Sequence, residues 1–511
     1  MLGQSVHNFV FSAFGTVSSL VLGFLFAGLS IRFLGEARAG YLMLLQSLIG
    51  LQAALGGFGL GVPAVRRIAI LHKNAEFSQA RTIAGSVVAV NLTTGVVVAL
   101  LLISLFPKVF VWSRLERGYR PDAFLATVLI GITFLLSQWA SAWQTVYQAL
   151  QRYDLLTGFA TTFGMLNGLI GILVLSRAPS LTAAAAVSLG MATLQLGVGA
   201  FFTKRLLHGT PWYGWSWREV RPMLSFGGWT YLGGIGNTLF MNMDRLVLTT
   251  FLGSAALPYY ALPQRIFAQI HSALTSYFQF LFPMLGSLGD GATQAIENLD
   301  DRLRWFVAML SGAAYTGLAL LGPTLLAHLV SRDFADRANI PLLLVCVQGF
   351  VHAQNIVPYY TSWAAGQGRP NAVMALFHGL LVISTAVVLI PKLGYVGASL
   401  AQLWILVIVI VHSIWVCRIL SRQRLSWRWL SWLVSPCVMI GVWFLVVKGL
   451  APVLPNHAVS LFCLTLVGAL AGVGAVSYVE RLVFPAQRRW RTLTRAFQLL
   501  SELLKRRVLA K

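Results

Sequence analysis

The chain has 511 residues, of which 57% are hydrophobic and 10% are charged, and its mean hydropathy is +0.74. A soluble protein carries roughly 25% charged residues because its surface must be solvated. The composition therefore excludes a soluble globular protein. The apolar residues fall in blocks of a length that spans a bilayer, about 20 residues for a helix. We predict an all-α integral membrane protein.

The formal net charge of +23 raises the question of nucleic acid binding. That function needs basic residues gathered on one soluble face. Here the basic residues lie in short segments between apolar blocks, as expected for lipid-headgroup anchors. The four cysteines have neither CxxC spacing nor a histidine at metal-ligand spacing. We expect no nucleic acid partner, no metal and no cofactor.

Apolar runs bounded by charged residues, glycine or proline predict about fourteen transmembrane helices. An even number places both termini on the same side of the membrane. The predicted spans are 8–31, 39–62, 83–106, 123–150, 156–176, 180–203, 223–252, 256–286, 305–330, 338–365, 371–390, 394–417, 431–450 and 457–478.

The distribution of lysine and arginine predicts the orientation. With the N-terminus inside, 25 of the 38 basic residues lie in cytoplasmic segments and 11 in external ones. This excess satisfies the positive-inside rule, so both termini are predicted to be cytoplasmic. The tail 479–511 has apolar residues at helical spacing among basic ones, which predicts an amphipathic helix lying on anionic lipid. A solvated, frayed tail is the alternative.

An internal repeat relates two segments 218 residues apart. Residues 33–46 and 251–264 share seven identities over fourteen positions, and both connect the same pair of elements, helix 1 to 2 and helix 7 to 8. Two parallel six-helix lobes with a substrate site between them are a transporter architecture. The lobes are predicted to be pseudo-symmetric. We predict an N-lobe at 1–222, a C-lobe at 223–417, two further helices within 418–478 and the cytoplasmic tail.

Charged residues inside the predicted spans are few, and Asp244, Arg245 and Arg265 stand out. A charge in hydrocarbon costs several kcal/mol, so such residues usually face a bundle interior or a hydrated cavity. The two arginines are suited to bind a diphosphate or an acidic sugar through paired N–H donors. Alternatively, Asp244 neutralises one of them in a buried pair that ties helices 7 and 8 together. The two readings are compatible.

Amide side chains near these charges complete the predicted substrate site. Asn242 lies on helix 7, and Gln264 and Gln269 lie on helix 8. In the first lobe, Gln46 occupies the position that matches Gln264 in the repeat. Asn242 could also form an ordinary hydrogen bond between helices. His271 is interpreted as a packed histidine at a helix interface.

Three segments resemble bacterial polysaccharide flippases of the O-antigen type, in the multidrug/oligosaccharidyl-lipid/polysaccharide exporter superfamily. They are RFLGEARAGYLMLLQSLIGLQAALGGFGLGVPAVRRIA from Arg32, MNMDRLVLTTFLGSAALPYYALPQRIFAQ from Met241, and GQGRPN…LIPKLGYVGASLAQ from Gly366 to Gln402. Pro258 departs from the glycine that the family usually has there. The resemblance implies that an undecaprenyl-diphosphate-linked, anionic oligosaccharide is flipped to the external leaflet of the bacterial inner membrane by alternating access. It also implies contact with membrane lipids and possible polymerase or ligase partners in lipopolysaccharide synthesis.

Two transporters of the same superfamily and a membrane enzyme are the alternatives. A cation-coupled drug antiporter needs carboxylates inside the membrane, and helices 1 to 6 are predicted to contain none. A lipid II flippase tends to carry several basic residues within helices 1 and 2, where this chain has only Arg32 and Arg38 at the external boundary. A polymerase or ligase would need a large external loop with catalytic groups, and no such loop is predicted. We predict that the protein is not an enzyme.

Overall fold

A computed structural model describes residues 22–56, 60–209, 215–278, 293–364, 369–421, 431–450 and 467–468. Within these ranges every regular element is a helix. Seven helical stretches are long and apolar enough to cross a membrane. The predicted all-helical membrane architecture is therefore confirmed. The span 457–478, apart from residues 467 and 468, and the amphipathic tail 479–511 lie outside the described ranges.

The first half of the chain contributes long helices joined by short connections. Helix Leu22–Leu34 is separated from α2 by Gly35, and α5 and η1 lie in the connection before α6. The elements are α2 (Glu36–Gly56), α3 (Gly61–Lys73), α4 (Phe77–Ser104), α5 (Phe106–Ser113), η1 (Arg117–Tyr119), α6 (Arg120–Ala149), α7 (Tyr153–Arg177) and α8 (Leu181–Leu206).

The second half continues the same design, beginning with a 36-residue helix, α9. Its elements are α9 (Trp217–Leu252), η2 (Ser254–Ala256), α10 (Leu257–Phe278), α12 (Thr293–Leu329), α13 (Arg332–Ala353), α14 (Ile356–Ala364), α15 (Arg369–Ala401), η3 (Gln402–Trp404), α16 (Ile405–Ser421) and α17 (Ser431–Leu450).

The helices match the predicted spans but several extend beyond them. The predicted span 431–450 is helical throughout, as α17. The backbone leaves helical geometry within α15 at Gly394, the first residue of the predicted span 394–417. By contrast, α3 continues to Lys73, through a stretch predicted to be a loop. Hydropathy detects the segment inside hydrocarbon, whereas a helix continues with charged residues into the headgroup region.

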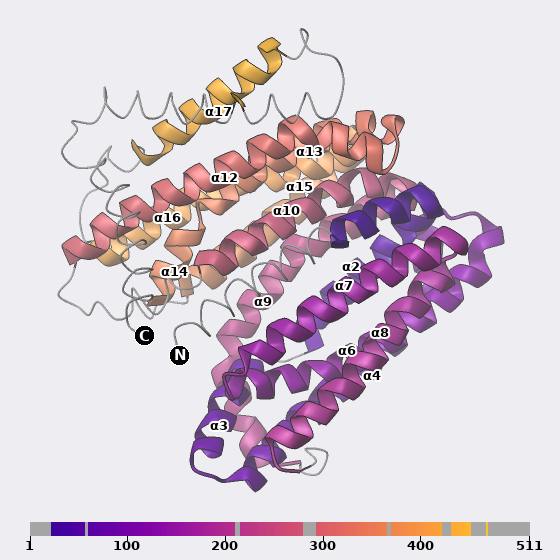
Figure 1. Cartoon of the computed structure of the whole chain (residues 1–511), viewed down its shortest axis with the longest axis vertical. Helices are drawn as coiled ribbons and strands as arrows, with labels where there is room; N and C mark the ends of the chain where they lie inside the picture. Colours follow the sequence, from indigo (N-terminus) through magenta and orange to yellow (C-terminus); the bar gives the residue numbers. More distant parts are fainter. Residues whose placement is uncertain are drawn as a thin grey trace.

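The helices lie in two groups (Figure 1). In the first group α6 packs against α4 and α8, and in the second α13 packs against α10 and α12. Helix α9 runs along α15 and also contacts α2, so it lies where the groups meet. The predicted lobe boundary at residue 222 falls inside α9, and the lobe limits stay a prediction. Helix α17 packs against α12.

The two repeated turns meet at one end of the bundle, which we call the closed end. Gly35 and Gly253 both have positive φ, 79° and 84°, as expected for equivalent turns that only glycine adopts without strain. The Ser254 hydroxyl donates to the Ala37 carbonyl at 2.8 Å. A Cβ built on Gly40 would overlap the backbone carbonyl of Ser254. The two halves therefore touch backbone to backbone at this end.

Candidate functional site

Asp244 is buried on α9 and receives three hydrogen bonds. Its carboxylate accepts from the Tyr260 hydroxyl, from the Gln402 amide at 2.5 Å and from the backbone N–H of Arg245 at 2.7 Å. Only 1% of the residue is exposed. Buried charge is tolerated where hydrogen bonds replace lost water, and these donors provide that replacement. Asp244 therefore ties α9 to α10 and η3.

The hydrogen bonds continue from Asp244 through three glutamines. The Gln348 amide donates to Gln402 at 3.4 Å, and the Gln264 amide donates to Gln348 at 2.8 Å. All three glutamines are buried. The predicted site residue Gln264 thus lies inside a polar network that joins α9, α10, α13 and η3. Sequence reasoning missed Tyr260, Gln348 and Gln402, although amides at membrane depth are a signal that would have indicated the glutamines.

Arg245 follows Asp244 on α9 and reaches towards α2. Its Nη1 donates to the Ser47 hydroxyl at 3.4 Å, across the boundary between the two halves of the chain. Its Nε is buried and has no hydrogen-bond partner among the described residues. A guanidinium carries five N–H donors. Arg245 therefore keeps donors available for a further acceptor.

Arg265 lies on α10 at a depth that matches Asp244. Asp244 is eight residues from Leu252 and Arg265 is eight residues from Leu257, about 12 Å along each helix at 1.5 Å per residue. Arg265 is half-buried, and it forms neither a hydrogen bond nor an ion pair with any described residue.

Gln269 and Arg265 both face the helix Leu22–Leu34. A Cβ built on Gly23 would lie 3.1 Å from Nε2 of Gln269 and 4.0 Å from Nη2 of Arg265. The absence of a side chain at Gly23 leaves room beside these two groups. The structure thus brings Arg245, Arg265 and Gln269 to the junction of α2, α9, α10 and the helix Leu22–Leu34.

The two remaining predicted site residues have different surroundings. The Asn242 amide donates to the Thr238 carbonyl one turn earlier on α9, at 3.2 Å. Gln46 is exposed, whereas Leu42 and Met43, which precede it on the same side of α2, are buried. Asn242 therefore has a local partner, and Gln46 reaches open space next to Ser47.

The geometry distinguishes the two interpretations of the intramembrane charges, arginines that bind substrate and an Asp244–arginine pair that ties helices together. Asp244 forms no ion pair with Arg245 or Arg265 among the described residues. Its hydrogen bonds come instead from neutral side chains and a backbone N–H. The carboxylate does join helices, as the structural reading requires, but it does so without engaging either guanidinium. Two cationic groups are left facing the junction.

Two further polar features lie among the helices of the second half. The His271 ring lies 5.6 Å from Phe267 and 4.3 Å from His352, and His352 lies 6.3 Å from His378, between ring centroids. The interpretation of His271 as a packed histidine is confirmed. Arg304 on α12 is buried and donates to Ser413 at 3.5 Å. Arg304 lies at the end of a predicted loop, directly before the predicted span 305–330, so it does not count as a charge inside a predicted span.

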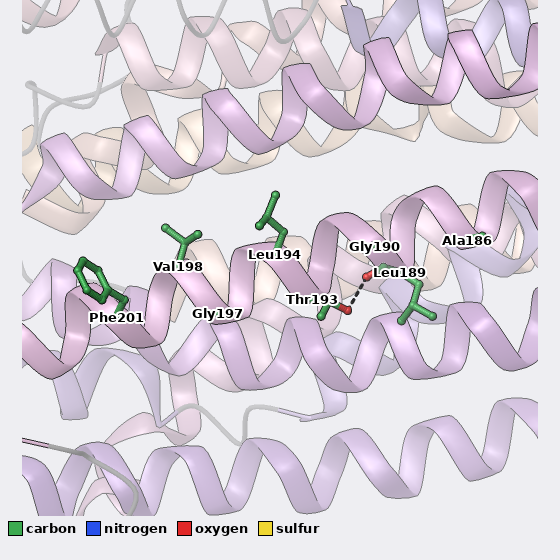
Figure 2. A pocket seen from close by; sticks show the side chains of 8 residues that line it. All are labelled: Ala186, Leu189, Gly190, Thr193, Leu194, Gly197, Val198 and Phe201. Carbon is green, nitrogen blue, oxygen red and sulfur yellow. Dashed lines mark hydrogen bonds between the residues drawn. The ribbon is translucent and has the colours of Figure 1, made fainter.

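A cavity of about 830 Å³ lies along α8, away from these residues (Figure 2). Apolar and small side chains line it, including Gly190 and Gly197. Its polar residue Thr193 donates to the Leu189 carbonyl of its own helix at 2.9 Å, so it offers little to a polar ligand. Lipid tails suit such a surface. This cavity is not part of the charged site.

The fold is that of membrane transporters. The lipid II flippase MurJ in an inward closed conformation aligns with a TM-score of 0.73, over 93% of this chain and 99% of MurJ, at 12% identity. An inward-facing multidrug resistance MATE family transporter of the MOP superfamily aligns with a TM-score of 0.65, over 80% of this chain and 98% of the transporter, at 15% identity. The apolar helices and these similarities define a multi-pass membrane protein with a transporter fold.

The sequence pattern of the polysaccharide biosynthesis protein family matches residues 5–288, and the chain belongs to this family. A further relative is the uncharacterized membrane protein EpsK of Bacillus subtilis (strain 168). It is 25% identical over 394 residues, which cover 73% of this chain and 74% of EpsK. The resemblance inferred from the three segments is therefore confirmed at the level of family and superfamily fold.

Proposed function

We propose that the protein flips an undecaprenyl-diphosphate-linked oligosaccharide from the cytoplasmic to the external leaflet of the bacterial inner membrane. One observation carries the proposal: Arg245 and Arg265 face the junction of the two helix groups without a carboxylate partner among the described residues. Cationic groups inside a bilayer are costly unless an anion joins them. A diphosphate is an anion that two guanidinium groups bind well, through paired N–H donors.

The neutral groups beside the arginines suit a glycolipid headgroup. Gln269 lies next to Arg265, and Ser47 lies next to Arg245. Amides and hydroxyls can both donate and accept hydrogen bonds, so they suit sugar hydroxyls as well as phosphate oxygens. We assign Arg245 and Arg265 to the diphosphate, with Gln269, Gln46 and Asn242 around the adjoining sugar. Asp244 and Gln264 hold α9 and α10 in place.

Alternating access supplies the movement. In this proposal the closed end faces the outside, as the positive-inside rule predicts, and both termini are cytoplasmic. The contacts of Gly40 and Ala37 with Ser254 then close the external side while the site receives substrate from the cytoplasmic leaflet. Rocking of the N-lobe (1–222) against the C-lobe (223–417) would break these contacts and expose the arginines to the outside.

The acidic residues of the first half argue against a cation-coupled drug antiporter. Asp122 accepts the backbone N–H groups of Leu181 and Thr182, each at 2.9 Å, so it caps the start of α8. Asp154 pairs with Arg152 at 2.8 Å at the start of α7. Both carboxylates have local structural partners at helix ends. The carboxylates of the described helices of this half, Glu36, Asp122 and Asp154, all lie in the first turn of their helices and not at mid-membrane depth.

Deletion of the gene followed by lipid analysis tests the proposal. We expect the lipid-linked oligosaccharide to accumulate on the cytoplasmic leaflet and surface polysaccharide to be lost. Complementation by Arg245→Ala or Arg265→Ala should fail at normal membrane expression, and the exposed Arg177→Ala should complement fully. If deletion changed drug sensitivity and left surface polysaccharide intact, the antiporter alternative would replace this proposal. Polymerase or ligase partners would be sought by crosslinking in the complemented strain.

A further inference from the structure

A second cavity lies within the first helix group, between α3, α4 and α6. It has a volume of about 230 Å³. Six polar side chains share its wall: Asn91, Gln138, Ser141, Gln144, Thr145 and Gln148. None of its lining residues is acidic or basic, so its chemistry differs from that of the arginine site.

The polar wall is a continuous stripe on one membrane-spanning helix. Gln138, Ser141, Thr145 and Gln148 follow one another at spacings of three, four and three residues on α6, which places them on one face. An amide exposed to hydrocarbon is costly, so such a stripe must face protein or water. The stripe faces this cavity. The same spacing is present in the amino-acid sequence.

The three glutamine side chains that line the cavity form no hydrogen bond with any described residue. Asn91 is held in place because its amide donates to the Gln138 carbonyl at 3.2 Å and to the Ser141 hydroxyl at 2.9 Å. The side-chain amides of Gln138, Gln144 and Gln148 have no hydrogen-bond partner in the part of the chain that the structure describes. Each amide offers two N–H donors and one acceptor. The cavity thus presents three unused amides around a fixed asparagine.

The position of the cavity relative to the arginines limits what can enter it. Arg38, next to the closed-end contacts, donates to the Pro179 carbonyl just before α8. Asp122, near the start of α6, accepts from Leu181 in the same turn. Helix α6 therefore begins at the closed end. Gln138 is 18 residues, about 27 Å, along α6 from Arg120. Arg265 is about 12 Å from the start of α10 at the same end. The cavity is therefore farther from the closed end than the arginines are, and the difference exceeds the width of one sugar ring.

We propose that this cavity is a subsite for a neutral sugar ring of the lipid-linked oligosaccharide, beyond the sugar attached to the diphosphate. This inference rests on the proposed function. Pockets for drug-sized ligands measure roughly 300–1,000 Å³, and this smaller cavity suits a single ring. Amides pair with hydroxyls in both directions, whereas the uncharged wall gives no counter-charge to an acidic sugar. The subsite would bind this sugar ring before the closed end opens.

The test uses vesicles that contain the purified full-length protein and two probes. One is undecaprenyl diphosphate carrying a single neutral sugar, and the other is the complete lipid-linked oligosaccharide extracted from the deletion strain. The variant is Gln144→Leu combined with Gln148→Leu, with the exposed Gln79→Leu as the matched control. We expect flipping of the complete oligosaccharide to fall at least tenfold in the double variant, while the single-sugar probe moves at the wild-type rate.

Other outcomes separate this inference from the proposed function. If the double variant flips both probes like the wild type, the cavity holds water only and the subsite does not exist. If it loses both probes equally while its melting temperature is unchanged, the glutamines act on the general transport step and the inference is wrong. If the wild-type protein moves neither probe, the proposed function itself fails. Should the double variant not fold, the exposed single change Gln148→Leu gives the same comparison.

Discussion

Gly40 of α2 lies directly against the backbone carbonyl of Ser254 in η2, with no room for a side chain between them. The Ser254 hydroxyl bonds in turn to the Ala37 carbonyl at 2.8 Å. Gly40 and Pro258 occupy matching positions of the internal repeat, and a Cβ on Gly40 would lie 3.1 Å from Cδ of Pro258. The two copies of the repeat thus close one end of the protein by packing against each other.

Substitution of Gly40 should prevent this closure. In Gly40→Ala the new methyl group overlaps Ser254, and overpacking of this kind costs about 1–3 kcal/mol. We expect transport to fall at least tenfold. A cysteine introduced as Ser47→Cys, with the native cysteines replaced, should become reactive to a membrane-impermeant maleimide. Gly190→Ala, which meets no atom within 4 Å, is the control. Normal transport and an unlabelled cysteine in Gly40→Ala would rule out the gating role.

The hydrogen bond from Tyr260 to Asp244 should stabilise the second half of the chain. A hydrogen bond to a charged group contributes about 1.5–3 kcal/mol, and Tyr260→Phe removes one of the donors to this carboxylate. We expect a lower melting temperature in detergent, and a larger decrease for Asp244→Ala, which removes the common acceptor of three hydrogen bonds. Tyr395→Phe should have no effect, because its hydroxyl has no described partner. Equal stability of Tyr260→Phe and wild type would refute the network.

Asp122 should act as a helix cap and not as a coupling group. Its carboxylate accepts two backbone N–H groups and the Thr182 hydroxyl at the start of α8. Loss of a cap costs about 0.5–2 kcal/mol, so Asp122→Ala should be less stable than the wild type. Each folded molecule should still transport normally in the vesicle assay. A stable Asp122→Asn variant without transport would indicate that the carboxylate carries protons or cations.

Filling the space at Gly23 should block the site without removing a charge. A leucine there would crowd the Gln269 amide, which already lies 3.1 Å from the Cβ position, and then the Arg265 guanidinium. We expect Gly23→Leu to lower the affinity for undecaprenyl diphosphate at least tenfold while the protein still folds. Affinity equal to that of the wild type, with Gly23→Leu stably folded, would mean that substrate does not approach Arg265 from this side.

Features of this fold that depend on neighbouring residues could be predicted from the sequence, whereas contacts between distant residues could not. The helix α17 and the break at Gly394 follow from a run of apolar residues and a helix-breaking glycine, which are local properties. Asp244, Arg245 and Arg265 were found because charge is rare inside hydrocarbon. Gln402 lies 158 positions from Asp244, and no periodicity within one helix could have paired them.

Other differences have physical causes of their own. Helix α3 was missed because basic residues interrupt its hydropathy, although they do not interrupt its backbone hydrogen bonds. The carboxylate–guanidinium pair of the alternative interpretation is absent from the described residues because Tyr260, Gln402 and a backbone N–H satisfy Asp244. Adjacent residues on a helix point in different directions, so the sequence neighbours Asp244 and Arg245 need not bind each other.

Binding of undecaprenyl diphosphate to the purified protein tests the central claim most directly. Native mass spectrometry would compare the wild type with Arg245→Ala, Arg265→Ala and the exposed control Arg177→Ala at matched lipid concentrations. We predict binding to the wild type and to Arg177→Ala, and at least a tenfold loss of affinity in each of the other two variants. Equal binding by all four proteins would contradict the assignment of the two arginines to an anionic substrate.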